Sequence, residues 1–200
     1  MRSVQEETLA RFFKDLRRGG TYNRKWWNPI EFSMYVHDLV RYEEIPNVVE
    51  IGTGNGVTAS WAALGGANVW TCDMVDRPKV WDAVDIFPLP NLTIRIEYFT
   101  MLGDDFLGYQ AKGRAGRIGP RLFKGNELLI LDGPNGEKGF RRQWDYVRNF
   151  VRKDDIIVAP IGSPDIYQCF LKLKAAGYDI KYNTSTESYT LIWPAEALDW

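Results

Sequence analysis

Residues 48–57 read VVEIGTGNGV, and this stretch decides the fold. Its first four residues are apolar apart from Glu50, which is typical of a short strand covered on both faces. Glycines follow at Gly52, Gly54 and Gly56, and a helical pattern begins directly after them. Glycine lets the backbone turn tightly and lets a ligand approach the main chain, while the start of a helix offers N–H groups. The stretch therefore predicts a strand, a turn that binds a polar ligand, and a helix.

Short apolar runs and helical segments alternate along the rest of the chain. The further runs are NVWTCDMV, LTIRIEYF, ELLILDG and DIIVAPIG, and the helical patterns cover 57–64, 140–152 and 165–176. Strands that alternate with helices pair in parallel through right-handed crossovers, so we expect an open α/β sheet. The runs VVEI, LLIL and IIVA are apolar and belong at its centre, whereas LTIRIEYF alternates apolar and polar residues and predicts an edge strand.

Both ends of the chain add elements to this sheet. Residues 7–20 have apolar side chains at helical spacing, and a second helix is expected to begin at Pro29 and to end near 43–46. Residues 178–194 contain two alternating runs joined by a polar turn near 183–188, which predicts a hairpin. We therefore expect two N-terminal helices before the sheet and a C-terminal hairpin after it.

Composition limits the classes of protein that this chain can form. Its 200 residues and 23.0 kDa, with 45% hydrophobic and 26% charged residues, are typical of a single folded domain over 1–200. Lys and Arg number 25 against 26 Asp and Glu, so the net charge of -1 gives no overall attraction to nucleic acid or to an anionic membrane. The N-terminus lacks an apolar signal run and no stretch could span a membrane, so we expect a cytoplasmic protein.

Cysteine and histidine are scarce, with Cys72, Cys169 and His37 the only three. Two cysteines are too few for a disulfide scaffold or a zinc site, and they predict small, reduced core residues. A single histidine leaves little scope for a metal site built on imidazoles or for a Ser-His or Cys-His mechanism. We expect His37 to be a hydrogen-bonded core residue or to lie at the solvent edge.

The spacing of the glycine turn distinguishes between ligands. A dinucleotide fingerprint, G-x-G-x-x-G, would need glycine at Val57, and the carboxylate of Glu50 would repel a pyrophosphate. The same carboxylate suits a cation such as S-adenosylmethionine, which has an ammonium, a sulfonium and no phosphate. The segment EIGTGNG at 50–56 resembles motif I of the class I S-adenosylmethionine-dependent methyltransferases. That resemblance implies that the loop lies under the methionine part of the cofactor, with contacts from Glu50, Gly52, Thr53, Gly54, Asn55 and Gly56.

A second acid closes the next strand, where Asp73 follows the run NVWTC. An acceptor-only side chain at this point can take both ribose hydroxyls of a nucleoside. We therefore assign Asp73 to the ribose and its neighbour Met74 to the same cofactor site, and we interpret Asp76 as a surface turn residue. Asp104, after the predicted edge strand, occupies the region where related enzymes contact adenine, with a plain turn as the alternative.

A third acid, Asp132, ends the run LLIL and opens the segment DGPNG. Because the carboxyl ends of parallel strands meet at one edge of a sheet, residues 50–56, 73 and 132–135 should converge there. LDGPNG, followed by Arg141 and Arg142, resembles the strand-4 segment of class I methyltransferases, several of which are small-molecule or sugar O-methyltransferases. Asp132 could take the proton of a hydroxyl acceptor as a base, or it could position the ammonium of the cofactor.

The resemblance covers residues 47–193 and implies a three-layer Rossmann-like α/β fold. The expected sheet is seven-stranded and mainly parallel, its C-terminal hairpin supplies the antiparallel strand, and the helices of residues 1–46 cover the cofactor cleft. Strand five runs into APIGSPD without the Asp-Asn pair of the magnesium-binding catechol-type enzymes, so we expect no metal. DGPN also differs from the Asp/Asn-Pro-Pro-aromatic loop of enzymes that methylate DNA bases. We therefore expect metal-free methyl transfer to a hydroxyl of a small molecule or sugar.

Alternatives stay open at this level. The chain could be a non-catalytic module that binds S-adenosylmethionine, or an enzyme of the same fold that transfers an aminopropyl group. It could also be an RNA methyltransferase that uses the basic segment 112–124, although that segment equally fits a solvated surface. Trp26 and Trp27 fit either a lid over the cofactor or ordinary packing of the N-terminal helices. The sequence does not decide the oligomeric state.

Overall fold

The computed structural model describes most of the sheet and the helices that pack on it. The described residues are 7, 30–54, 56–73, 96–100, 103, 105–106, 126–133, 137–148, 155–160, 164–183 and 188–192. The helices are α2 (Ile30–Tyr42), α3 (Val57–Gly65), α7 (Glu137–Val147) and α8 (Pro164–Ala175). The strands are β1 (Asn47–Ile51), β2 (Asn68–Asp73), β3 (Ile96–Thr100), β4 (Glu127–Leu131), β5 (Ile156–Pro160), β6 (Asp179–Asn183) and β7 (Ser188–Ile192).

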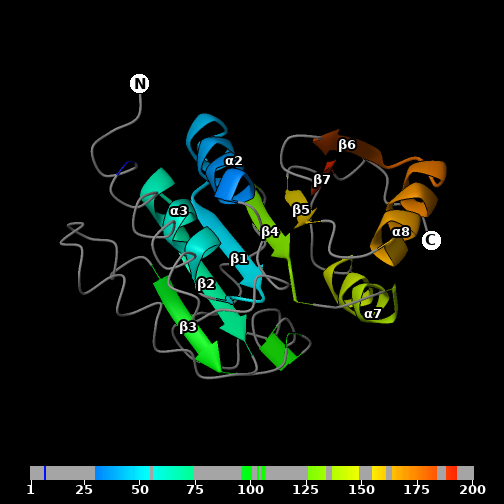
Figure 1. Ribbon diagram of the computed structural model, residues 1–200, viewed down its shortest axis with the longest axis horizontal. Coiled ribbons are helices and arrows are strands. Elements are labelled where there is room, and N and C mark those ends of the chain that lie inside the picture. The colour runs from blue at the N-terminus through cyan, green and yellow to red at the C-terminus, as the bar shows by residue number, and fades with distance from the viewer. Residues whose placement is uncertain are drawn as a thin grey trace.

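The strands of the described ranges form one sheet in the order β3-β2-β1-β4-β5-β7-β6 (Figure 1). Strands β1 to β5 pair in parallel, and β7 runs antiparallel to both β5 and β6. The open α/β sheet predicted from the alternation of strands and helices, and the Rossmann-like fold that the resemblance implies, are therefore confirmed. The apolar runs form the inner strands β1, β4 and β5, and the described part of the alternating run, from Ile96, forms the edge strand β3, as the pattern predicts.

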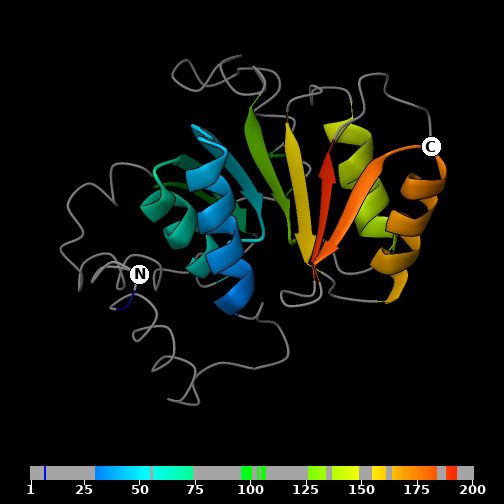
Figure 2. The same cartoon turned by 90° about the horizontal axis from the view of Figure 1, so that it is seen from above.

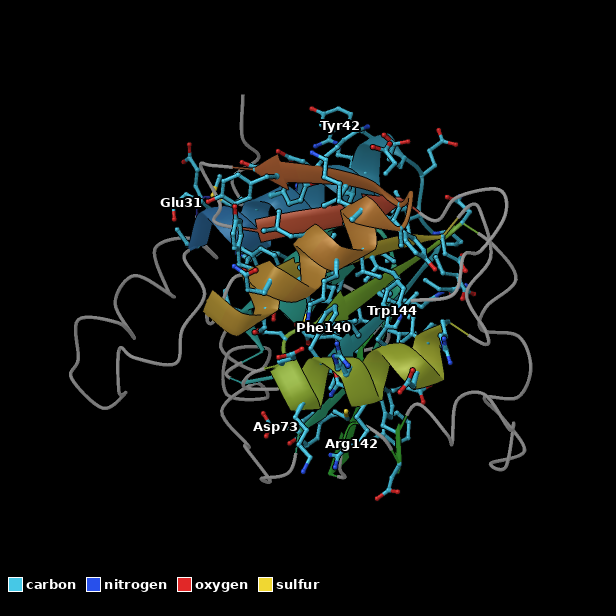
Figure 3. All side chains as sticks on the ribbon, turned by 90° about the vertical axis from the view of Figure 1, so that its right-hand side faces the viewer. Glu31, Tyr42, Asp73, Phe140, Arg142 and Trp144 are labelled. Atoms are coloured by element: carbon cyan, nitrogen blue, oxygen red, sulfur yellow. The ribbon has the colours of Figure 1, made fainter. Side chains whose placement is uncertain are left out.

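Helices cover both faces of the sheet and make three layers. Figure 2 shows α2 and α3 on one face and α7 and α8 on the other. Alternate residues of the inner strands point to opposite faces, so Val48 packs toward α2 and α3 while Val49 packs toward α7 and α8. On α7, the buried Phe140 and Trp144 face the sheet, whereas the exposed Arg142 lies on the opposite side (Figure 3). Two apolar cores, one on each side, hold the strand ends in place.

Helix α2 is the second of the two expected N-terminal helices. It spans Ile30–Tyr42, close to its predicted bounds, whereas the first expected helix over 7–20 lies outside the described residues apart from Glu7. His37 is buried on α2, and its Nδ1 lies 3.0 Å from Asp38 Oδ1, which confirms a hydrogen-bonded core histidine. Cys72 and Cys169 are buried thiols, as predicted. No helix within the described ranges is long and apolar enough to cross a membrane.

Candidate active site

The glycine turn after β1 lies where the strand order reverses, because β1 has β2 on one side and β4 on the other. Gly52, Gly54 and Gly56 all have positive φ angles, of 92°, 57° and 70°. Side chains rarely adopt this region, which explains why the turn uses glycine at each point. At such a reversal the loops diverge and leave a crevice at the carboxyl ends of the strands. The turn predicted from the sequence therefore lies where this class of sheet binds ligands.

Two of these glycines have different surroundings. A Cβ atom on Gly52 would lie 2.9 Å from the carbonyl carbon and oxygen of Asp132 and from Cα of Gly133, so the turn packs directly against the loop after β4. A Cβ on Gly54 would meet nothing within 4 Å among the described residues. Among the described residues, the space beside Gly54 is therefore open, whereas Gly52 is closely packed against the backbone of the loop after β4.

The end of β2 holds the turn in place through three hydrogen bonds. The N–H groups of Gly52 and Thr53 donate to the carbonyl oxygen of Cys72 at 2.9 and 3.0 Å. The N–H of Gly54 donates to Asp73 Oδ2 at 2.9 Å. Asp73 is partly exposed at the tip of the strand (Figure 3), so its carboxylate fixes the turn and remains partly accessible to solvent. The turn and Asp73, which the sequence placed in one site, are thus in direct contact.

Helix α3 begins at the end of the turn with its first N–H groups uncapped by a side chain. Its N-cap is Gly56, no side chain makes a cap hydrogen bond, and the first turn has no acidic residue. The N–H of Gly56 itself donates to the carbonyl oxygen of Thr53 at 2.8 Å. The amino end of a helix carries a partial positive charge and attracts anionic groups. This end of the crevice therefore suits a carboxylate.

Glu50 lies beneath the turn and is almost completely enclosed. Glu50 is only 1% exposed, and its Oε2 accepts a hydrogen bond of 2.5 Å from the hydroxyl of Thr71. The hydroxyls of Thr71 and Thr53 lie 2.6 Å apart, so three buried polar side chains form a continuous chain. Glu50 Oε1 is buried and has no hydrogen-bond partner among the described residues. A buried oxygen without a partner is costly unless a ligand or a proton compensates it.

This environment raises the pKa of Glu50 from 4.5 to about 8. Burial is the main cause, because removal from water disfavours the charged form. The negative charges of Asp132 and Asp73 raise it further, and the hydrogen bond from Thr71 opposes the rise. The effect of both aspartates on Glu50 shows that the three acids predicted from separate strands converge at one edge of the sheet.

Asp132 sits at the tip of β4, next to β1. Its N–H donates to the carbonyl oxygen of Ile51 at 2.9 Å, and its side chain is partly exposed. A Cβ on Gly133 or Gly103 would come within 2.7 or 2.5 Å of Ile51 Cγ2, so both backbones pack closely on this side chain. Ile51 thus fixes the loops after β3 and β4 relative to the glycine turn.

The structure describes only some of the residues that the sequence assigned to the site. Asn55, Met74 and Asp104 lie outside the described residues, as do segment 112–124 and the pair Trp26 and Trp27. Within the described ranges, no group of three or more His, Cys, Asp or Glu side chains could hold a metal ion. Arg141, which follows the Asp132 loop, forms an ion pair of 3.1 Å with Glu137 on its own helix.

Thr71 is the residue of this site that sequence reasoning missed. It lies inside the run NVWTCD, where it looks like an ordinary strand residue. In the parallel register of β1 and β2, however, Thr71 is the direct partner of Glu50. Its signal was therefore available once these two strands were paired, because partners in a parallel ladder point to the same face.

Comparison with known proteins identifies the fold. No protein-family model and no curated protein sequence matches the chain. An O-methyltransferase from Bacillus cereus in complex with SAH matches with a TM-score of 0.64 and 15% identity, over 96% of this chain and 92% of that chain. The O-methyltransferase TomG from Streptomyces achromogenes, involved in tomaymycin synthesis and solved with SAM, matches with a TM-score of 0.63 and 13% identity, over 96% and 89% of the two chains. The chain therefore has a Rossmann-like α/β fold similar to the folds of these O-methyltransferases.

Proposed function

We propose that this protein is an S-adenosylmethionine-dependent methyltransferase that transfers a methyl group to a hydroxyl of a small molecule or sugar, without a metal. One observation carries the proposal. The glycine turn, bonded to Asp73, lies beside the acids Glu50 and Asp132 at the reversal of the strand order. The fold around this arrangement is shared with O-methyltransferases that were solved with SAM or SAH.

The donors and acceptors of the crevice fit a nucleoside with an amino-acid tail. The carboxylate of Asp73 accepts a hydrogen bond from Gly54 N–H, and we assign the ribose hydroxyls to the same carboxylate, which has about four acceptor positions in all. The uncapped start of α3 suits the carboxylate of the tail, and the charge of Glu50 suits its ammonium. No described residue fills the space beside Gly54, which supports placing the ligand against the backbone there. Following the sequence pattern, the proposed cofactor set also includes Gly52, Thr53, Asn55, Gly56, Met74, Asp104 and Asp132.

S-Adenosylmethionine, when bound, would supply a methyl group bonded to a positively charged sulfonium. Once that methyl group is transferred, the sulfonium becomes a neutral thioether, which is a good leaving group. The main task of the chain is to hold the two reactants in line, which is worth on the order of 7–11 kcal/mol for well-oriented groups. Asp132, partly exposed at the tip of β4, is the carboxylate we assign to accept the proton of the acceptor hydroxyl. A positioned base of this kind contributes roughly 10²–10⁴-fold to the rate.

The test combines binding and turnover with the full chain. Isothermal titration calorimetry with S-adenosylmethionine and S-adenosylhomocysteine measures cofactor binding, and mass spectrometry follows an isotope-labelled methyl group into a mixture of hydroxyl-bearing acceptors. We expect both ligands to bind and a labelled methyl ether to form. For Asp132→Asn we expect kcat to fall by a larger factor than the affinity for the cofactor, because Asp132 is assigned both to proton transfer and to the cofactor set. Binding without transfer to any acceptor would favour the non-catalytic module, and failure of both ligands to bind would overturn the proposal.

A further inference from the structure

The buried chain Thr53–Thr71–Glu50 has a defined direction. The hydroxyl of Thr71 has one hydrogen and donates it to Glu50 Oε2. The hydrogen bond between Thr53 and Thr71 must then be donated by Thr53, because Thr71 has no second hydrogen to give. Both hydroxyl hydrogens therefore point toward Glu50. This arrangement suits an ionised carboxylate, since charged acceptors form the stronger hydrogen bonds.

The charges around Glu50 favour the opposite state while the crevice holds no cation. The charged groups that act on it within the described part of the chain are Asp73 at the tip of β2 and Asp132 at the tip of β4, and both are negative. The nearby thiol of Cys72 stays neutral, because burial raises its pKa to about 12. Glu50 Oε1 has no donor within the same residues. A proton on Glu50 relieves both the repulsion and the burial of charge.

We propose that Glu50 couples ligand charge to a proton: it is protonated in the empty site and ionises when the ammonium of the cofactor binds at the glycine turn, and the Thr53–Thr71 chain stabilises the ionised form. The proton passes to solvent, so cofactor binding releases one proton per site. Thr71 acts as a positioning residue in this scheme, through its hydrogen bond to Glu50. The inference rests on the proposed function, because it takes the ligand to be a nucleoside with a cationic tail.

Calorimetry of the full chain in two buffers with different ionisation enthalpies counts the protons released. We expect S-adenosylhomocysteine, which has the ammonium, to release about one proton at pH 7 and to bind about tenfold more tightly at pH 7 than at pH 6. 5′-Methylthioadenosine has the same nucleoside without the charged tail and should release none. If both ligands bind and release the same number of protons, the inference is overturned, although cofactor binding is still supported.

Variants identify the titrating group. Glu50→Gln should abolish proton release and flatten the pH dependence of binding. Glu127→Gln, which changes an equally buried glutamate at the opposite end of the sheet, should leave both as in the wild type. Thr71→Val should move the rise in affinity to higher pH, and Thr71→Ser should restore it. Wild-type proton release in both Glu50→Gln and Thr71→Val would overturn the inference.

A measurement without ligand separates the inference from the proposed function. The carboxyl carbon of Glu50, assigned by comparing ¹³C NMR spectra of the wild type and Glu50→Gln, should show a protonated group at pH 7 in the ligand-free protein. A charged Glu50 at pH 7, together with normal binding of S-adenosylhomocysteine, would overturn the inference alone. Absence of binding at every pH would overturn the inference together with the function on which it rests.

Discussion

Replacing Glu50 with glutamine should remove a loss of stability that the ligand-free protein undergoes as the pH rises. Burial and the neighbouring aspartates raise the pKa of Glu50 to about 8 in the folded chain, whereas the ordinary value is 4.5. Between these values the folded state holds a proton that the unfolded state has lost, so the free energy of unfolding falls with increasing pH. Below pH 4.5 both states are protonated and the contribution is constant.

The size of the effect follows from this interval. From 4.5 to about 8 is roughly 3.5 pH units, and each unit corresponds to about 1.36 kcal/mol, which gives an upper value of about 5 kcal/mol. Local relaxation reduces the cost of a buried charge, so we expect a fall of about 2–4 kcal/mol between pH 5 and pH 8. Glutamine has nearly the shape of protonated glutamate and cannot ionise, so Glu50→Gln should lack this part of the pH dependence.

Urea unfolding followed by circular dichroism at pH 5, 6, 7 and 8 measures the difference. The stability of Glu50→Gln relative to the wild type should increase steadily over this range. Glu31→Gln, at an exposed position on α2, is the control and should follow the wild type at every pH. Parallel curves for the wild type and Glu50→Gln would show that Glu50 ionises as an ordinary exposed glutamate and would refute the reasoning from burial.

Three further changes test other parts of the structure. Gly52→Ala places a Cβ 2.9 Å from the backbone of Asp132 at a φ of 92°, so it should cost about 1–3 kcal/mol in the free energy of unfolding; an unchanged urea midpoint would contradict the tight packing of the turn. Asp73→Ala removes the acceptor of Gly54 N–H and the proposed ribose contact, so calorimetry should show cofactor binding weaker by about 1–3 kcal/mol, and binding as tight as in the wild type would refute the ribose assignment. Phe140→Ala empties a fully buried site between α7 and α8 and should cost about 3–5 kcal/mol in thermal or chemical unfolding, with a loss below 1 kcal/mol speaking against the packing described.

Periodicity was enough to identify the strands and their environment. The runs VVEI, LLIL and IIVA are apolar at every position except Glu50, and they form the inner strands, because helices on both faces leave no side of these strands in water. The run at 92–99 alternates, and the part of it that is described, from Ile96, forms the edge strand. These features follow from the local spacing of apolar and polar residues, which can be read directly from the sequence.

The burial, the hydrogen-bond partner and the pKa of Glu50 could not be predicted from the spacing of residues in the sequence. From the sequence it is a negative charge at a strand tip, facing a cationic ligand. In the structure it is 1% exposed, its partner is Thr71 on the neighbouring strand, and burial raises its pKa to about 8. Burial and hydrogen-bond partners depend on which strands are neighbours and in which register they pair. Neither is encoded in the spacing of residues along one strand.

The sequence by itself determined the order of strands and helices, the glycine turn at 52–56 and the three acids at the ends of separate strands. Only the tertiary structure decided that β1 lies between β2 and β4, which brings Asp73 and Asp132 close enough for their charges to act on Glu50. The physical reason is that these two groups of features depend on different kinds of neighbours. Backbone turns and apolar periodicity follow from neighbours in the chain, whereas electrostatic coupling and desolvation follow from neighbours in space, which the packing of the whole sheet creates.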